Sequence, residues 1–151
     1  KVLAYDKYIK INEPGILQVE LEEFYSQVNV LSFHVPQTLE TIDMGNYKFF
    51  SKFKTPLIVL NISRGNVIHT QGLVRAMKEG VVEKAALDVL EYETKSFERF
   101  FESPLPDDFL YLKSNPNVVL TPHVAGWTSE SYYKLSNVLA EKIIKSKSLQ
   151  F

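Results

Sequence analysis

Hydrophobic runs of strand length alternate along this chain with amphipathic stretches of helix length. The runs predict strands at Val2–Tyr5, Val28–His34, Leu57–Ile62, Ala85–Leu90 and Val118–Thr121. The amphipathic stretches predict helices near Leu21–Gln27, Asn46–Lys52 and Thr70–Glu79, and a final helix over Ser129–Lys145. This alternation is typical of βαβ units and a mostly parallel sheet. Because the predicted strands are apolar throughout, we expect helices on both faces of the sheet.

Some of these elements carry further signals. Thr70 can cap the start of the helix at Thr70–Glu79, and Gly80 can stop it. By contrast, prolines and phenylalanines crowd the segment Tyr92–Asn117, where we expect a short aromatic helix followed by an irregular loop. In the final helix, the apolar residues that fall on one face are Leu135, Val138, Leu139 and Ile143.

The composition narrows the class of protein. A chain of 151 residues, 45% hydrophobic and 23% charged, is typical of one soluble globular domain. The net charge of -1 gives no electrostatic reason to expect nucleic acid or an anionic membrane as a partner. The absence of cysteine excludes disulfides, thiolate catalysis and cysteine-ligated zinc. A cytoplasmic location is the default expectation.

Three ionisable residues, Arg64, Glu93 and His123, each come just after a predicted strand. Each alone has a structural interpretation: Arg64 and Glu93 as solvated loop charges, and His123 as a satisfied structural histidine. Of Glu91 and Glu93, one is expected to be simply solvated. The carboxyl ends of parallel strands, however, share one edge of the sheet, where ligands bind. A cation, a carboxylate and an imidazole facing one cleft there can bind a carboxylate-bearing substrate and move a proton.

The strings around these residues resemble the signature segments of the D-isomer-specific 2-hydroxyacid dehydrogenases. They are Asn61–Gly65 (Asn-x-x-Arg-Gly), Asp88–Glu93 (Asp-Val-x-x-x-Glu) and Pro122–Gly126 (Pro-His and small residues). Glu93 lies 29 residues after Arg64, and His123 lies 30 residues after Glu93, as in that family. A fourth string, Phe33–Pro36, resembles the turn after the fourth strand of its nucleotide domain. The resemblance covers essentially the whole chain.

The resemblance implies a catalytic role for each of the three residues. Arg64 would bind the substrate carboxylate and polarise the 2-oxo group, since a guanidinium can pair bidentately with a carboxylate. His123 would be the general acid in reduction and the base in oxidation. Glu93 would hydrogen-bond His123 and fix its orientation.

The resemblance also implies NAD as the cofactor. Asp6 ends the first predicted strand, where a dinucleotide-binding fold places the acid that binds the adenosine ribose, and this favours NAD over NADP. No metal site is expected, because His34 has no supporting cluster and is better explained as part of the cofactor wall. The implied cofactor-binding residues are Asp6, His34, Val35, Pro36, Thr41, Ile62, Ser63, Asp88 and His123.

The chain also departs from the family pattern. Its glycines are at 15, 45, 65, 72, 80 and 126, and no two are spaced as Gly-x-Gly. The sequence therefore predicts an incomplete Rossmann-like, doubly wound α/β fold without the first strand, glycine-rich turn and first helix. We expect the C-terminal part of a longer enzyme: residues 1–128 as a partial NAD-binding domain, and 129–151 returning toward a substrate domain. The isolated chain should be inactive, with an open sheet edge near Val2–Tyr5 and Leu57–Ile62 or their neighbours.

The predicted activity is an NAD-dependent oxidoreductase that interconverts a D-2-hydroxy acid and its 2-oxo acid, and the whole protein is expected to be a homodimer. Gly126 favours D-3-phosphoglycerate dehydrogenase, because D-lactate enzymes often have an aromatic residue there. A D-lactate or hydroxypyruvate type remains an alternative, as does a non-catalytic, corepressor-like NAD-binding regulator. Glu93 weakens a formate- or phosphite-type assignment. Trp127 could pack the final helix against the fold or shape the substrate pocket.

Overall fold

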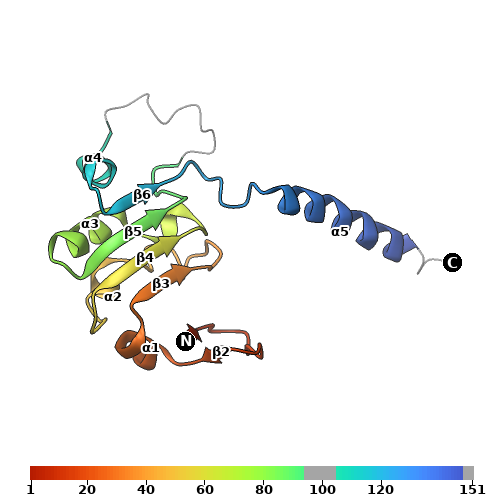
Figure 1. Ribbon diagram of the computed structural model, residues 1–151, viewed down its shortest axis with the longest axis horizontal. Helices are drawn as coiled ribbons and strands as arrows, with labels where there is room; N and C mark the ends of the chain where they lie inside the picture. The colour runs from red at the N-terminus through yellow and green to blue at the C-terminus, as the bar shows by residue number, and fades with distance from the viewer. Residues whose placement is uncertain (94–104, 148–151) are drawn as a thin grey trace.

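The structure, a computed structural model, describes residues 1–93 and 105–147 and contains two parallel sheets (Figure 1). The main sheet has the order β3-β4-β5-β6, and a separate pair joins β1 to β2. The strands are β1 (Val2–Ala4), β2 (Ile16–Gln18), β3 (Val30–Phe33), β4 (Leu57–Asn61), β5 (Val82–Leu87) and β6 (Val118–Leu120). The helices are α1 (Leu21–Gln27), α2 (Tyr47–Phe50), α3 (Thr70–Lys78), α4 (Asp107–Ser114) and α5 (Ser129–Lys147), with a 3₁₀ turn, η1 (Gly65–Val67).

The prediction of a parallel sheet with alternating helices is confirmed, and each predicted strand overlaps an observed one. The largest displacement is at β5, which starts at Val82 instead of Ala85 and ends before Asp88. Strand β2 was not predicted. It has only three residues and directly follows Gly15, whose φ of 84° turns the chain, so no hydrophobic run of ordinary strand length marks it.

Burial along the strands shows that the two faces of the main sheet are not covered equally. In β4, Leu57 and Val59 are buried while Ile58 and Leu60 are only half-buried. The buried face forms one core with residues of α2, α3 and α4, namely Phe50, Leu73, Val74, Met77 and Leu112. The core of the main sheet therefore lies on the face that α2, α3 and α4 cover.

The bounds of helix α3 agree with the prediction, but its N-cap residue differs. His69, not Thr70, is the N-cap residue, and its Nδ1 accepts a hydrogen bond from the Gly72 amide at 3.2 Å. Thr70 is the first helical residue and is buried. The predicted stop is confirmed, because Gly80 has a φ of 74°, which glycine adopts without a Cβ penalty.

Helix α4 lies where the sequence predicted an irregular loop, so that prediction was wrong. Pro106 occupies the N-cap position, where the missing amide donor of proline costs no helical hydrogen bond. Asp107 and Asp108 lie in the first turn, where their carboxylates interact favourably with the helix dipole. Phe109 and Leu112 are buried and hold this helix on the core. The aromatic helix predicted just before it lies outside the described residues.

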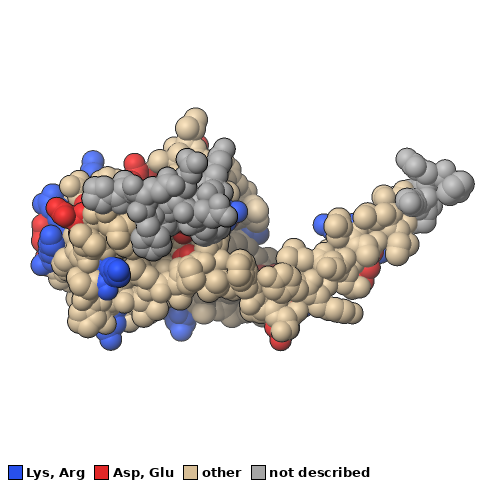
Figure 2. Space-filling model, turned by 90° about the horizontal axis from the view of Figure 1, so that it is seen from above, with Lys and Arg blue, Asp and Glu red and all other residues tan. Residues whose placement is uncertain are grey.

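Helix α5 extends away from the two sheets (Figure 1), and it projects from the body of the molecule in the space-filling view (Figure 2). Its predicted apolar face is exposed, with Leu135 69% and Leu139 59% accessible. Trp127, just before the helix, is 67% exposed, so it does not pack α5 against the fold as one interpretation held. No helix within residues 1–93 and 105–147 is both long and apolar enough to cross a membrane.

Among the described residues, the two sheets are not paired with each other. Strand β4 has a strand partner on both sides, whereas β3 ends the main sheet and β1 pairs with β2 alone. Open strand edges, which were expected near Val2–Tyr5 and Leu57–Ile62 or their neighbours, therefore occur at β1 and β3, as they do at β2 and β6. Leu3 of β1 nevertheless packs against the main core.

Candidate active site

The loops after β4 and β5 pack so closely that only glycine fits between them. A Cβ added at Gly65 would lie 1.9 Å from the carbonyl oxygen of Leu90 and 2.8 Å from the amide nitrogen of Glu91. These are backbone atoms of the turn after β5, which a side chain cannot displace without moving the turn. Gly65 therefore sets the approach of the loop that carries Arg64 to the loop that carries Glu93.

Asn61, at the end of β4, holds the Arg64 loop in shape. It is 1% exposed, and its Oδ1 accepts hydrogen bonds from the amide of Ser63 at 3.1 Å and from the Ser63 hydroxyl at 2.9 Å. Its Nδ2 donates to the carbonyl oxygen of Arg64 at 3.0 Å. Both polar atoms of this buried side-chain amide have hydrogen-bond partners in the loop. Asn61 therefore fixes the conformation of the loop that follows it.

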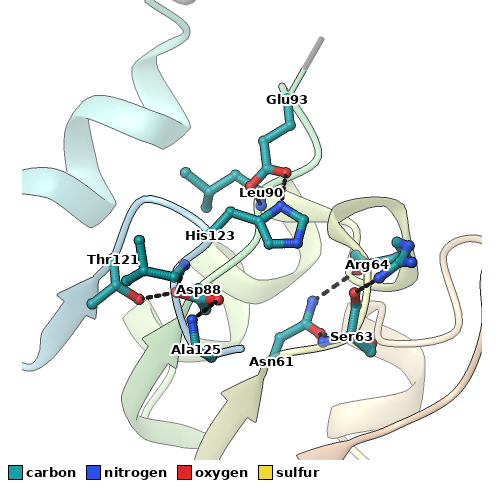
Figure 3. Close-up of polar contacts among 10 residues, drawn as sticks. Asn61, Ser63, Arg64, Asp88, Leu90, Glu93, Thr121, His123 and Ala125 are labelled. Carbon is teal, nitrogen blue, oxygen red and sulfur yellow. Dashed lines mark hydrogen bonds and ion pairs between the residues drawn. The ribbon is translucent and has the colours of Figure 1, made fainter. Parts of the chain in front are cut away.

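The second of the three candidate residues, Glu93, contacts the third, His123 (Figure 3). Glu93 Oε2 lies 3.1 Å from His123 Nδ1, while Glu93 Oε1 accepts from the Leu90 amide at 2.8 Å. One carboxylate oxygen is thus anchored to the backbone and the other orients the imidazole. In this arrangement Nε2 lies on the far side of the ring from Glu93, and the expected Glu93–His123 contact is confirmed.

Asp88 supports the turn that carries His123. It is 4% exposed, and its two oxygens accept from the amides of Val124 at 2.9 Å and Ala125 at 2.8 Å and from the Thr121 hydroxyl at 2.5 Å. Burial raises the pKa of Asp88, but these hydrogen bonds outweigh burial and leave its pKa below the ordinary value. The carboxylate is therefore stable as an anion beneath the turn.

His123 itself has a left-handed backbone, with a φ of 56°. Such a conformation costs a non-glycine residue about 1–3 kcal/mol and persists only where its surroundings enforce it. Here the His123 amide donates to the carbonyl oxygen of Asp88 at 2.9 Å, and the Asp88 side chain binds the next two amides. Strain at this residue is thus offset by the Asp88 hydrogen bonds.

Arg64 lies on the same edge of the sheet as the Glu93–His123 pair (Figure 3). Its side chain is exposed, and Nη1 donates to the carbonyl oxygen of Ser63 at 2.7 Å. The structure therefore joins Glu93 to His123 directly and brings Arg64 to the neighbouring loop. Within residues 1–93 and 105–147, the exposed contact with the Ser63 carbonyl oxygen is the hydrogen bond that the guanidinium makes. A carboxylate ligand could replace that contact.

The predicted cofactor residues fall into three groups. Ile62, Ser63, Asp88 and His123 lie at the ends of the strands of the main sheet, whereas Asp6 follows β1. His34, Val35, Pro36 and Thr41 follow β3, in a loop where the Thr41 hydroxyl donates to the carbonyl oxygen of Pro36 at 2.6 Å. His34 Nε2 lies 2.8 Å from Ser32 Oγ. No metal-binding cluster occurs among the described residues, which include His34.

The hydrogen bonds of Asp6 suit it to bind a ribose. Its Oδ1 accepts from the amides of Tyr8 and Ile9, both at 2.8 Å, and these donors lower the pKa of the carboxyl group. Its Oδ2 makes no hydrogen bond within the described part of the chain, so an ionised oxygen is left to accept from a hydroxyl. The acid at the end of β1 therefore fits the adenosine ribose of a dinucleotide.

Sequence reasoning missed three supporting residues. Glu91, to which no role was assigned, accepts a hydrogen bond from the Thr70 amide at 2.7 Å at the start of α3. Asn61 and Thr121 were parts of motifs without assigned roles. A polar residue at the end of an apolar strand was the available signal for both, and the Asn61 amide in addition requires partners because it is buried.

Comparisons with known proteins identify the family to which this chain is similar. A family model described as "D-isomer specific 2-hydroxyacid dehydrogenase, NAD binding domain" matches residues 1–125. The D-lactate dehydrogenase of Lactiplantibacillus plantarum is 37% identical over 142 residues, covering 91% of this chain and 43% of that protein. The D-3-phosphoglycerate dehydrogenase of Archaeoglobus fulgidus is 36% identical over 146 residues, covering 95% of this chain and 26% of that protein.

A solved structure extends the similarity to the fold. The NAD complex of a D-isomer specific 2-hydroxyacid dehydrogenase from Lactobacillus delbrueckii ssp. bulgaricus matches with a TM-score of 0.79 at 27% identity, over 97% of this chain and 46% of that chain. The chain spans less than half the length of these relatives. The family model and the shared fold together show that this chain belongs to the D-isomer specific 2-hydroxyacid dehydrogenase family, through its NAD-binding domain.

Proposed function

We propose that the natural protein containing this chain is an NAD-dependent oxidoreductase that interconverts a D-2-hydroxy acid and its 2-oxo acid. The observation that carries the proposal is the Glu93–His123 pair, anchored by the Leu90 amide at the carboxyl edge of the main sheet beside the Arg64 loop. An oriented imidazole beside a guanidinium is what proton transfer to a bound 2-oxo acid requires.

Each residue has a defined part in this chemistry. The Arg64 guanidinium binds the substrate carboxylate and thereby orients the 2-oxo group toward His123. In reduction, His123 Nε2 gives a proton to the carbonyl oxygen, and in oxidation it takes the proton back. Glu93 holds Nδ1, so the ring presents Nε2 and the imidazolium has an anionic partner. Asp6 would hold NADH through the adenosine ribose, and the bound cofactor would supply the hydride.

The substrate side chain is the finer part of the proposal. A Cβ at Gly126 would meet no atom within 4 Å, and the Gly126 backbone does not need a positive φ. Glycine is therefore not required there by packing or conformation. A glycine at this position would leave room for a 2-oxo acid larger than pyruvate, such as 3-phosphohydroxypyruvate. The two relatives, named for D-lactate and D-3-phosphoglycerate, are 37% and 36% identical, so similarity does not separate these substrates.

Helix α5 is proposed to belong to the substrate side of the natural protein. Residues 1–128 would bind the cofactor, and residues 129–151 would lead toward a substrate-binding part. The exposed apolar face of α5, including Leu135 and Leu139, would pack there. Homodimer formation and a cytoplasmic location stay predictions.

The test follows NADH absorbance in the natural protein with pyruvate, hydroxypyruvate and 3-phosphohydroxypyruvate. Turnover is expected with at least one, and fastest with 3-phosphohydroxypyruvate. A Gly126→Phe variant should lose the phosphorylated substrate more than pyruvate, because the ring fills the proposed space. NADH binding without turnover of any 2-oxo acid would instead support a regulatory protein. A preference for pyruvate that Gly126→Phe leaves unchanged would refute the substrate assignment alone.

A further inference from the structure

A cluster of three exposed side chains links the loop after β1 to the loop after β3. Glu40 Oε2 lies 2.9 Å from Lys7 Nζ and accepts a hydrogen bond from the Tyr8 hydroxyl at 2.5 Å. The Lys7 ammonium also lies 5.2 Å from the centre of the Tyr8 ring. The Lys7 ammonium and the Tyr8 hydroxyl therefore both bind the Glu40 carboxylate, which lies in the loop after β3.

This cluster adjoins the residues proposed to bind the adenosine half of the cofactor. Lys7 and Tyr8 directly follow Asp6, whose carboxylate fixes their turn through the Tyr8 and Ile9 amides. On the other side, Glu40 precedes Thr41, whose hydroxyl accepts from the Thr38 amide at 2.8 Å. Hydrogen bonds within each turn thus hold Asp6 on one side of the cluster and Thr41 on the other. The cluster lies between these two proposed cofactor-binding residues.

Lys7 is the cation next to the proposed ribose acid. NADP(H) differs from NAD(H) by a 2′-phosphate on that ribose, and enzymes that use NADP(H) place a cation near this position. In this structure the Lys7 ammonium instead binds Glu40. We propose that Glu40 strengthens the preference for NAD(H) that Asp6 sets, because it engages the Lys7 ammonium, which is then not available to bind a 2′-phosphate. This proposal rests on the NAD-dependent function proposed above.

The expected effect is moderate, because Lys7 and Glu40 side chains are both 56% exposed. Exposed ion pairs contribute little to stability, so loss of Glu40 should leave the fold intact. A released lysine that pairs with a phosphate in a solvent-exposed position should strengthen NADPH binding about fivefold. NADH lacks the phosphate, and its dissociation constant should change by less than about twofold.

A second cluster of the same chemistry provides a matched control. Glu79 accepts a hydrogen bond from the Tyr47 hydroxyl and from Arg75 Nε at 2.9 Å, on the side of the main sheet that carries α2 and α3. Arg75 also stacks over the Tyr47 ring, 3.8 Å from its centre. Glu79→Gln therefore removes the same kind of bridge, far in sequence from Asp6 and outside the residues proposed to bind cofactor.

The experiment measures NADH and NADPH dissociation constants by nucleotide fluorescence in the natural protein, for the unaltered form, Glu40→Gln, Lys7→Gln, the double variant and Glu79→Gln. Glu40→Gln should bind NADPH about fivefold more tightly and thereby lower the preference for NADH. Lys7→Gln added to Glu40→Gln should remove that gain, because the released cation is absent. Glu79→Gln should keep the unaltered ratio of the two constants.

The outcomes separate this proposal from the proposed function. If the unaltered protein binds NADH but Glu40→Gln keeps the same NADPH-to-NADH ratio, the role of Glu40 is refuted while the NAD-dependent function stands. The same holds if the double variant retains the gain in NADPH affinity. If the unaltered protein binds neither nucleotide, both proposals fail together.

Discussion

The two sides of the proposed cofactor and substrate region are built in contrasting ways. The His123 side (Asn61–Gly65, Asp88–Glu93 and Thr121–Gly126) belongs to one continuous sheet and is held by buried polar groups, Asn61 and Asp88. The Asp6 side (Asp6–Tyr8 and His34–Thr41) spans two sheets and is linked by exposed side chains such as Glu40.

The difference indicates which part must be rigid. Proton transfer depends on the position of His123 to a fraction of an ångström, and buried, fully satisfied hydrogen bonds supply that rigidity. Recognition of a ribose and its charge tolerates looser geometry, since electrostatic attraction or repulsion acts at a distance. Changes on the His123 side should therefore have large effects on rate and stability, and changes on the Asp6 side should alter cofactor preference.

The largest expected effect is the loss of the imidazole on the His123 side. His123→Ala in the natural protein should lower kcat about 10²–10⁴-fold, the usual contribution of a general acid–base group. Steady-state kinetics with saturating NADH and 2-oxo acid measure this. His34→Ala, the corresponding change on the Asp6 side, should mainly raise the KM for NADH. A near-normal kcat of the His123→Ala variant would refute the proposed role of His123 as the general acid and base.

The next effect concerns the packing that brings the His123-side loops together. Gly65→Ala would place a methyl group 1.9 Å from the Leu90 carbonyl oxygen, so the turn after β5 must move. We expect a loss of about 3 kcal/mol in the free energy of unfolding, at the upper end for overpacking. Urea denaturation measures it, with Gly126→Ala as the control because no atom lies near its added Cβ. Equal stability of the two variants would contradict the close packing.

A smaller and pH-dependent effect is expected at Asp88. Its pKa is lowered in the folded state, so its contribution to stability is present above the unfolded pKa of about 4 and is lost as pH falls through the folded value. Asp88→Asn should therefore lower the free energy of unfolding by about 2 kcal/mol at pH 7. The Val124 and Ala125 amides donate to different oxygens of Asp88, and asparagine has an NH₂ donor in place of one of them. The difference in unfolding free energy between the unaltered protein and Asp88→Asn should be smaller at pH 3 than at pH 7. A constant difference at both pH values would show that the charge does not matter.

The same contrast explains how much the sequence could predict. Arg64, Glu93 and His123 were identified because each comes within a few residues of the end of an apolar strand, and the ends of parallel strands lie along one edge of the sheet. The role of Gly65 depends on a backbone contact with Leu90, which no local pattern in the sequence records. Helix α4 was missed because prolines flank it, although Phe109 and Leu112 bury its inner face. Tertiary burial, not local propensity, decided that segment.

The smallest expected effect lies on the Asp6 side and concerns cofactor choice. Asp6 has two functions that different substitutions separate: Oδ1 holds the turn through the Tyr8 and Ile9 amides, and the charge opposes a 2′-phosphate. Asp6→Asn keeps an acceptor for the turn but removes the charge, whereas Asp6→Ala removes both.

We expect Asp6→Asn to improve NADPH binding relative to NADH by about fivefold, the size of one repulsive charge contact near solvent. Asp6→Ala should relax the preference similarly but also weaken NADH binding, because the turn and the ribose acceptor are lost. Titration of both nucleotides with the natural protein measures these ratios. Equal affinity of the unaltered protein for NADH and NADPH would reject Asp6 as the residue that selects NAD. A change in Asp6→Ala without one in Asp6→Asn would mean that the turn, and not the charge, governs the Asp6 side.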